Sequence, residues 1–121
     1  MAGNVKAPPV KLQGGRVLLG GGTGAADNAV QYTSPDVSWA NYHAIEAVTT
    51  ACDVYVTLDG TNWNAKPCFL SPIHSDPVLA ADENEVTIAE IWILRGKFAN
   101  IRVLQKGAGG SSACRVLHGV E

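Results

Sequence analysis

The sequence predicts an all-β protein, an antiparallel β-sandwich that is jelly-roll-like and carries an extended N-terminal arm. Segments of alternating apolar and polar residues recur along the chain, and clusters of Gly, Pro, Asn and Asp separate them. No stretch shows the periodicity of roughly 3.6 residues that marks an amphipathic helix. Short strands at such intervals are typical of a sandwich or a barrel. With 121 residues and no internal repeat, the chain predicts an arm over 1–15 and a single β-sandwich domain over 16–121.

The composition of residues 1–15 favours an extended arm. Two consecutive prolines oppose both a helix and a central strand, and three glycines add backbone freedom. Such an arm gains order when it lies on another surface, where its backbone can add hydrogen bonds along the edge of a neighbour's sheet. The residues predicted to bind a partner in this way are Val5, Pro8, Pro9, Val10 and Leu12.

The clearest strand is predicted over 52–59, where apolar and polar residues alternate without a break. The segment 86–95 is apolar on both faces toward its end, which predicts a central strand. The positions of 52–59 that are predicted to face the core are Cys52, Val54, Val56 and Leu58. The other predicted strands are 16–20, 42–49, 63–69, 98–106 and 112–120.

Long loops are predicted over 70–85 and over the Gly-rich segment 20–28, which we interpret as a flexible connection. Gly20, Gly22 and Ala25 match the G-x-G-x-x-A form of a dinucleotide fingerprint. The residues that follow show no helix that could meet a pyrophosphate, and no Lys-Ser/Thr pair completes a P-loop. The sequence therefore predicts no nucleotide site.

A structural turn is predicted where the strand 52–59 ends. Gly60 can adopt a positive φ at little cost, and the side chains of Asp59 and Asn62 can bond nearby backbone groups. Trp63 begins the returning strand and is expected to cover the turn with its ring. A calcium site would need further oxygen ligands that the neighbouring sequence does not supply. We therefore expect Asp59, Gly60, Asn62 and Trp63 to form a hairpin corner.

No catalytic or metal-binding motif is evident. His43, His74 and His118 are far apart in the sequence and match no metal-ligand spacing. The serines lack the context of a nucleophile elbow. The sequence therefore predicts a protein that is not an enzyme and that uses no cofactor and no metal.

Three cysteines, Cys52, Cys68 and Cys114, cannot all pair within one chain and match no zinc or redox motif. We expect reduced thiols that act as small core residues. A Cys52–Cys114 disulfide remains open as an alternative if their two strands are adjacent.

Charge and hydropathy exclude several classes of partner. The net charge is −2, and the nine Lys and Arg residues are scattered, so no basic surface for nucleic acid or an anionic membrane is predicted. The apolar run 88–94 is too short to span a bilayer and contains Glu90. The N-terminus lacks the apolar core of a signal peptide. We expect a soluble chain that is not exported and binds neither nucleic acid nor membrane.

Three segments together resemble small β-rich virion proteins of tailed bacteriophages: "VYVTLDGTNW", then "LRGKFANIRVLQKGAG", then "ACRVLHG". In those proteins a strand with an Asp-Gly turn is followed by G-x-F-x-x-I-R-V and a Gly-rich turn into the last strand. The resemblance covers residues 38–119 and offers no catalytic residue to carry over. It implies a capsid decoration (cement) protein that binds the major capsid protein as a homo-oligomer, in a virion assembled in the host cytoplasm.

Other functions fit the same pattern of strands. A tail or fibre component belongs to the same class of virion proteins. A carbohydrate-binding module would use Trp39, Trp63 and Tyr55 as a stacking platform, with coplanar and exposed rings, whereas buried rings would favour a scaffold. A small enzyme would need polar groups that converge in a pocket.

Exposed apolar side chains would support contacts with another protein. Leu104, Leu117 and Trp92 are predicted to be exposed, because they lie opposite the predicted inward faces. The alternative is a second packed sheet that covers these positions.

Overall fold

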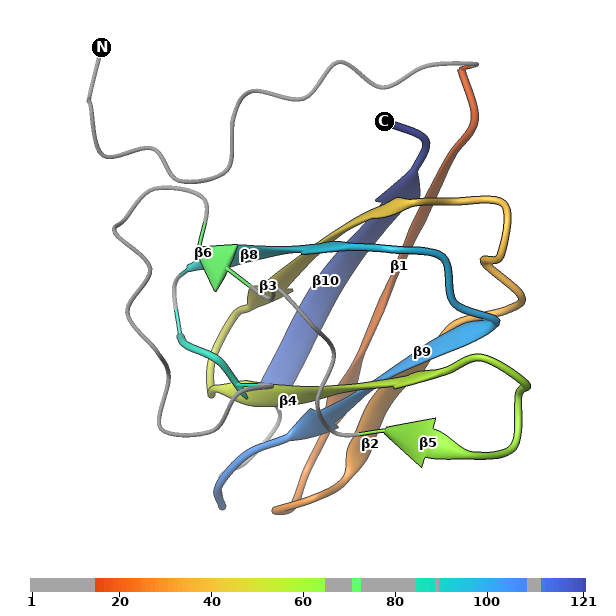
Figure 1. The fold of residues 1–121 in the computed structure, drawn as a ribbon. Helices are drawn as coiled ribbons and strands as arrows, with labels where there is room; N and C mark the ends of the chain where they lie inside the picture. Colours follow the sequence, from red (N-terminus) through yellow and green to blue (C-terminus); the bar gives the residue numbers. More distant parts are fainter. Residues whose placement is uncertain (1–14, 65–70, 73–84, 89, 109–111) are drawn as a thin grey trace, which may run out of the picture.

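The computed structural model describes residues 15–64, 71–72, 85–88, 90–108 and 112–121. Within these ranges, ten strands form two antiparallel sheets that pack face to face (Figure 1). The predicted β-sandwich is therefore confirmed. The predicted binding residues of the N-terminal arm lie outside the described residues.

The first sheet has the strand order β1-β10-β3-β8-β6. Its strands are β1 (Val17–Gly24), β10 (Ser112–Gly119), β3 (Tyr42–Ala47), β8 (Ile91–Arg95) and β6 (Ser71–Pro72). The longest pairing joins β1 to β10, from Val17 opposite Gly119 to Gly24 opposite Ser112. The segment 70–85 was predicted to be a loop, but it contains the short strand β6, which pairs with β8.

The second sheet has the order β2-β9-β4-β5, and β7 pairs with the other end of β4. Its strands are β2 (Val30–Thr33), β9 (Asn100–Gln105), β4 (Cys52–Thr57), β5 (Trp63–Asn64) and β7 (Glu85–Val86). The strands β1 to β4 alternate between the two sheets, as do β8 to β10. This alternation supports a jelly-roll-like path, which stays a prediction because 65–70 and 73–84 are outside the described residues.

The core lies between the sheets and is built from alternate residues of the longer strands. Its fully buried members include Ile45, Val54, Ile101 and Val103. Trp92 belongs to this core with 5% of its surface exposed, so the prediction of an exposed Trp92 was wrong. The strand β8 is buried on both faces, as the apolar pattern of 86–95 predicts, and Trp92 lies on the face that packs in the core.

The Gly-rich segment corrects a second expectation, because Val17–Gly24 is a strand and only 25–28 lies outside it. Alternate residues of β1 are glycines where β2 packs closely against this strand. A Cβ atom on Gly20 would meet the hydroxyl of Tyr32, and one on Gly22 would meet the carbonyl oxygen of Gln31. The glycines therefore permit close approach rather than flexibility.

The alternation predicted for 52–59 holds through Val56, and β4 ends at Thr57. Leu58 is 79% exposed, whereas Thr57 before it is buried. The hydroxyl of Thr57 accepts a hydrogen bond from the Gly60 N–H at 3.1 Å and donates one to Asp59 at 3.0 Å. The turn thus draws a polar side chain inward and pushes Leu58 into solvent.

Both described cysteines are buried free thiols. Cys52 lies on β4 and Cys114 on β10, which belong to different sheets, so the condition for a disulfide between adjacent strands is not met. Burial raises the pKa of both thiols. Cys68 lies outside the described residues.

Candidate functional site

The hairpin corner is organised around the carboxylate of Asp59. Its Oδ1 atom accepts hydrogen bonds from the backbone N–H groups of Thr61 and Asn62, each at 2.8 Å. The side-chain amide of Asn62 donates to Oδ2 at 2.6 Å. These bonds hold the pKa of Asp59 well below its usual range, the largest contribution being the Asn62 N–H. Gly60 adopts a φ of 83°. The carboxylate is committed to its own turn, which is the arrangement of a structural corner.

The aromatic residues of the carbohydrate hypothesis are half-buried. The guanidinium of Arg102 lies 4.1 Å from the ring centroid of Trp63, and that of Arg16 lies 3.9 Å from the ring centroid of Trp39. Tyr55 lies opposite Arg102 in the pairing of β4 with β9. Because an arginine covers one face of each tryptophan, only the opposite face remains for stacking on a sugar.

A buried pair of histidines was missed from the sequence. His43 on β3 and His118 on β10 are directly opposite each other, and their Nδ1 atoms lie 2.8 Å apart. Tyr32 places its hydroxyl 3.0 Å from Nε2 of His118, and Nε2 of His43 lies 2.9 Å from the carbonyl oxygen of Gly96. Both histidines are fully buried. Their inward position in the alternation was the available signal, but only the strand pairing brings them together.

A second buried polar chain links the sheets through Gln31, Ser112 and Gln105. The Gln31 amide donates to Ser112 Oγ at 2.8 Å, and that hydroxyl donates to Gln105 Oε1 at 2.6 Å. The Gln105 amide in turn donates to the carbonyl oxygen of Gly107 at 2.9 Å. These bonds satisfy the buried hydroxyl of Ser112 and the side chain of Gln105, so we interpret the chain as structural.

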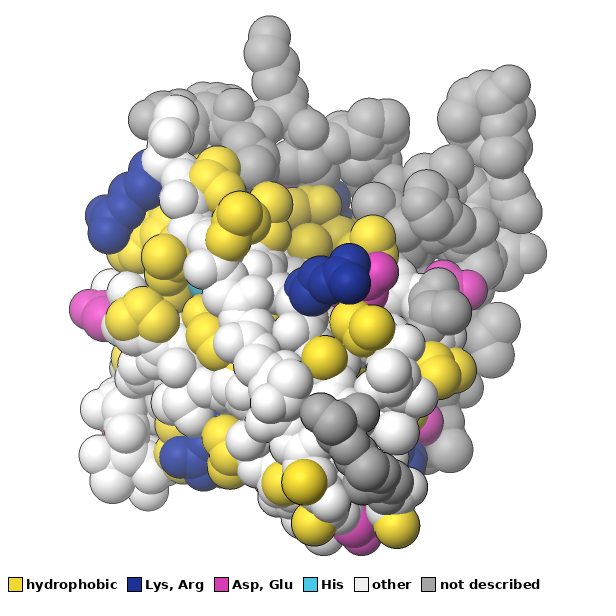
Figure 2. Space-filling model, turned by 180° about the vertical axis from the view of Figure 1, so that it is seen from behind, with side chains coloured by type: hydrophobic (Ala, Val, Ile, Leu, Met, Phe, Trp, Pro, Cys, Tyr) yellow, Lys and Arg dark blue, Asp and Glu magenta, His cyan; other side chains and the backbone are white. Residues whose placement is uncertain are grey.

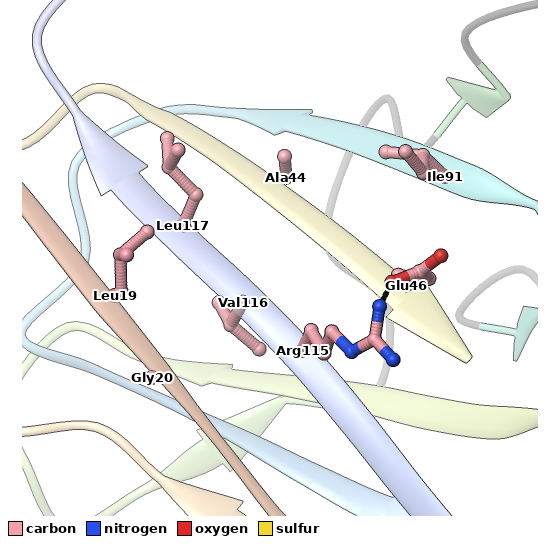
Figure 3. A pocket seen from close by; sticks show the side chains of 8 residues that line it. All are labelled: Leu19, Gly20, Ala44, Glu46, Ile91, Arg115, Val116 and Leu117. Carbon is pink, nitrogen blue, oxygen red and sulfur yellow. Dashed lines mark hydrogen bonds and ion pairs between the residues drawn. The ribbon is translucent and has the colours of Figure 1, made fainter. Parts of the chain in front are cut away.

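An apolar hollow of about 380 Å³ lies over β1, β10, β3 and β8 on the outer face of the first sheet (Figure 3). Figure 2 shows hydrophobic side chains on the rear of the molecule, with a Lys or Arg beside an Asp or Glu. The lining residues are Leu19, Gly20, Ala44, Glu46, Ile91, Arg115, Val116 and Leu117.

The most exposed apolar side chain of the hollow is Leu19, at 73%. Leu117 and Ile91 are half-buried beside it. Arg115 and Glu46 form an ion pair of 3.3 Å at one end of the hollow (Figure 3). Most of this lining is apolar, so it offers van der Waals contact.

Among the described residues, no group of three or more His, Cys, Asp or Glu side chains could hold a metal ion. The same part of the chain contains no helix of the length and hydropathy that would cross a membrane. No protein-family model, no curated protein and no solved structure matches the chain.

Proposed function

We propose that the chain is a non-enzymatic structural protein that docks on another protein through the hollow of its first sheet. The observation that carries this proposal is the lining of that hollow, in which apolar side chains lie beside one ion pair at its end. Val17 and Leu19 add 44% and 73% exposed side chains along the same side of β1. Contiguous exposed apolar area with a polar rim is typical of protein–protein contact surfaces.

The specific assignment is a capsid decoration protein that binds the major capsid protein, and it rests on the resemblance to small phage virion proteins. A rigid β-sandwich with one apolar outer face suits a protein that adds to a preformed shell. A tail or fibre component would use the same kind of face. The carbohydrate alternative is weaker, because arginines cover one face of Trp39 and of Trp63.

The test is co-sedimentation of the purified protein with undecorated capsid shells. We expect Leu19→Glu to weaken shell binding at least about tenfold, since a carboxylate would have to be buried in the contact. Leu58→Glu is the matched control, because Leu58 is 79% exposed but lies at the hairpin corner of the other sheet. Neither substitution should change the melting temperature of the free protein.

Each outcome of this experiment bears on a different part of the proposal. Failure of the unchanged protein to bind any shell would overturn the decoration assignment. Binding that survives Leu19→Glu but is lost in Leu58→Glu would move the docking surface to the second sheet. Equal binding by all three proteins would show that neither leucine lies in the contact.

A further inference from the structure

A buried hydrogen-bonded chain joins the two sheets through Tyr32, His118 and His43. Tyr32 belongs to β2 of the second sheet, whereas both histidines belong to the first. The chain ends on the carbonyl oxygen of Gly96, in the connection from β8 to β9. Opening the chain would therefore loosen the contact between the sheets as well as one connection between them.

Only one order of protons satisfies every bond when both imidazoles are neutral. The carbonyl oxygen of Gly96 can only accept, so His43 carries its proton on Nε2 and its Nδ1 atom is an acceptor. The proton between the two Nδ1 atoms must then belong to His118. The Nε2 atom of His118 is consequently an acceptor, and the hydroxyl of Tyr32 donates to it.

Protonation of the two imidazoles disturbs this order of hydrogen bonds. A first extra proton fits only on Nε2 of His118, and the hydroxyl of Tyr32 must then turn from donor to acceptor. A second extra proton would place N–H groups on both Nδ1 atoms, which lie 2.8 Å apart. Two cationic donors that face each other at this distance have no acceptor between them, so the rings must separate.

Aromatic rings lie against the histidine pair. The ring of Phe98 lies 5.8 Å from that of His43, and the ring of Tyr32 stacks on His118 at 5.9 Å. Tyr32, from β2, is itself titratable, and the buried thiol of Cys114 on β10 interacts with it.

The strands on either side of the histidine pair add only apolar neighbours. Leu94 of β8 lies opposite His43, and Leu18 of β1 lies opposite His118. Arg95, which precedes Gly96 in the chain, is paired with Glu121 at 2.7 Å, and Arg115 of β10 is paired with Glu46 at 3.3 Å. Among the described residues, no carboxylate contacts either imidazole. Burial lowers the pKa of both histidines to about 4, and the neighbouring His43 adds to the effect on His118.

We propose that Tyr32, His118 and His43 form an acid-sensitive lock, which holds the two sheets together at neutral pH and opens when both imidazoles are protonated. The sign follows from linkage. A histidine titrates near pH 6.5 in the unfolded chain and, with a lowered pKa, only near pH 4 in the folded one. The unfolded chain therefore binds more protons between these values, so stability is lost as the pH falls through this window. This property goes beyond the docking role and does not depend on any partner.

The first experiment measures urea unfolding of the whole chain between pH 7 and about pH 5, where carboxylates of ordinary pKa stay mainly ionised. For the unchanged protein we expect the unfolding constant to rise by up to about tenfold per histidine for each unit by which the pH falls. His43→Gln keeps a donor toward Gly96, and His118→Asn keeps an N–H toward His43. Each single variant should reduce the pH dependence of the unfolding constant, and the double variant should lose the contributions of both histidines. His74→Asn, which removes the third histidine, is the control.

A double variant with the slope of the unchanged protein would overturn the lock, as would a slope abolished by His74→Asn. Nitrogen-15 NMR of the unchanged protein supplies a test that does not depend on the folding of variants. At pH 7 we expect His43 to be protonated on Nε2 and His118 on Nδ1, and both to remain neutral in the folded state at pH 5.5. Either imidazole in the other tautomer, or titrating near pH 6.5 while the protein is folded, would refute the proposal.

Discussion

The hydroxyl of Tyr32 occupies the space into which a side chain at Gly20 would project. The two residues lie on neighbouring edge strands of different sheets, β1 and β2, which close one side of the sandwich. The carbonyl oxygen of Gln31, the residue before Tyr32, blocks a Cβ at Gly22 in the same way. The close approach of these strands depends on glycine, and it also places Tyr32 within reach of His118.

Gly22→Ala should therefore lower the free energy of unfolding by about 2 kcal/mol or more, as overpacking commonly does. The new methyl group would meet backbone, which cannot rotate away as a side chain can. Thr23→Ala is the matched control, because Thr23 is the exposed next residue of the same strand. Urea unfolding compares the two variants, and a loss in Gly22→Ala no larger than that in Thr23→Ala would contradict close packing as the cause.

Substitution at the hairpin corner should separate backbone strain from crowding. Gly60 has a φ of 83°, and a Cβ there would meet only the side-chain oxygen of Asn100 at an ordinary 3.5 Å. We expect Gly60→Val to lower the free energy of unfolding by about 1 kcal/mol or more. Gly60→Asn should cost less, because asparagine tolerates positive φ. An unchanged melting temperature in Gly60→Val would contradict this account of the corner.

The thiols of Cys52 and Cys114 should not react while the protein is folded. Both are buried, and burial raises the pKa of each, so little thiolate forms at pH 8. The measurement is labelling by a chromogenic disulfide reagent in a Cys68→Ser variant. We expect slow labelling in native buffer and two equivalents per chain in denaturant. Rapid reaction of the folded variant would show that the core between the sheets is open.

Removal of the predicted arm should separate folding from binding. The buried residues of the core cluster that the structure describes all lie within 37–116, so deletion of residues 1–15 should leave the melting temperature of the free protein nearly unchanged. If Val5, Val10 and Leu12 anchor the arm on a neighbour, the same deletion should sharply weaken sedimentation with capsid shells. Replacing Val5, Val10 and Leu12 by Ser in the full chain tests the anchors without shortening it. Unchanged binding by both proteins would remove the arm from the mechanism.

Local patterns predicted much of the sandwich. The alternation predicted for 52–59 identified the buried face of β4 up to Val56, and the doubly apolar end of 86–95 indicated a strand that is buried on both faces. The residues of the corner also predicted their own conformation, because Asp59 bonds to groups no more than three positions away. Such features are readable because strand alternation and turn hydrogen bonds involve neighbours in the sequence.

The candidate sites depend on contacts between distant residues, which no local pattern contains. His43 and His118 are 75 positions apart and meet only because β3 pairs with β10 in one register. The hollow likewise needs four strands side by side. The prediction of a flexible Gly-rich connection was wrong for the same reason, since the need for glycine comes from contacts with Gln31 and Tyr32 on the other sheet. By itself the sequence determined which residues alternate and where the chain turns. Only the tertiary structure decided which strands became neighbours, because register and sheet order come from the packing of the whole chain.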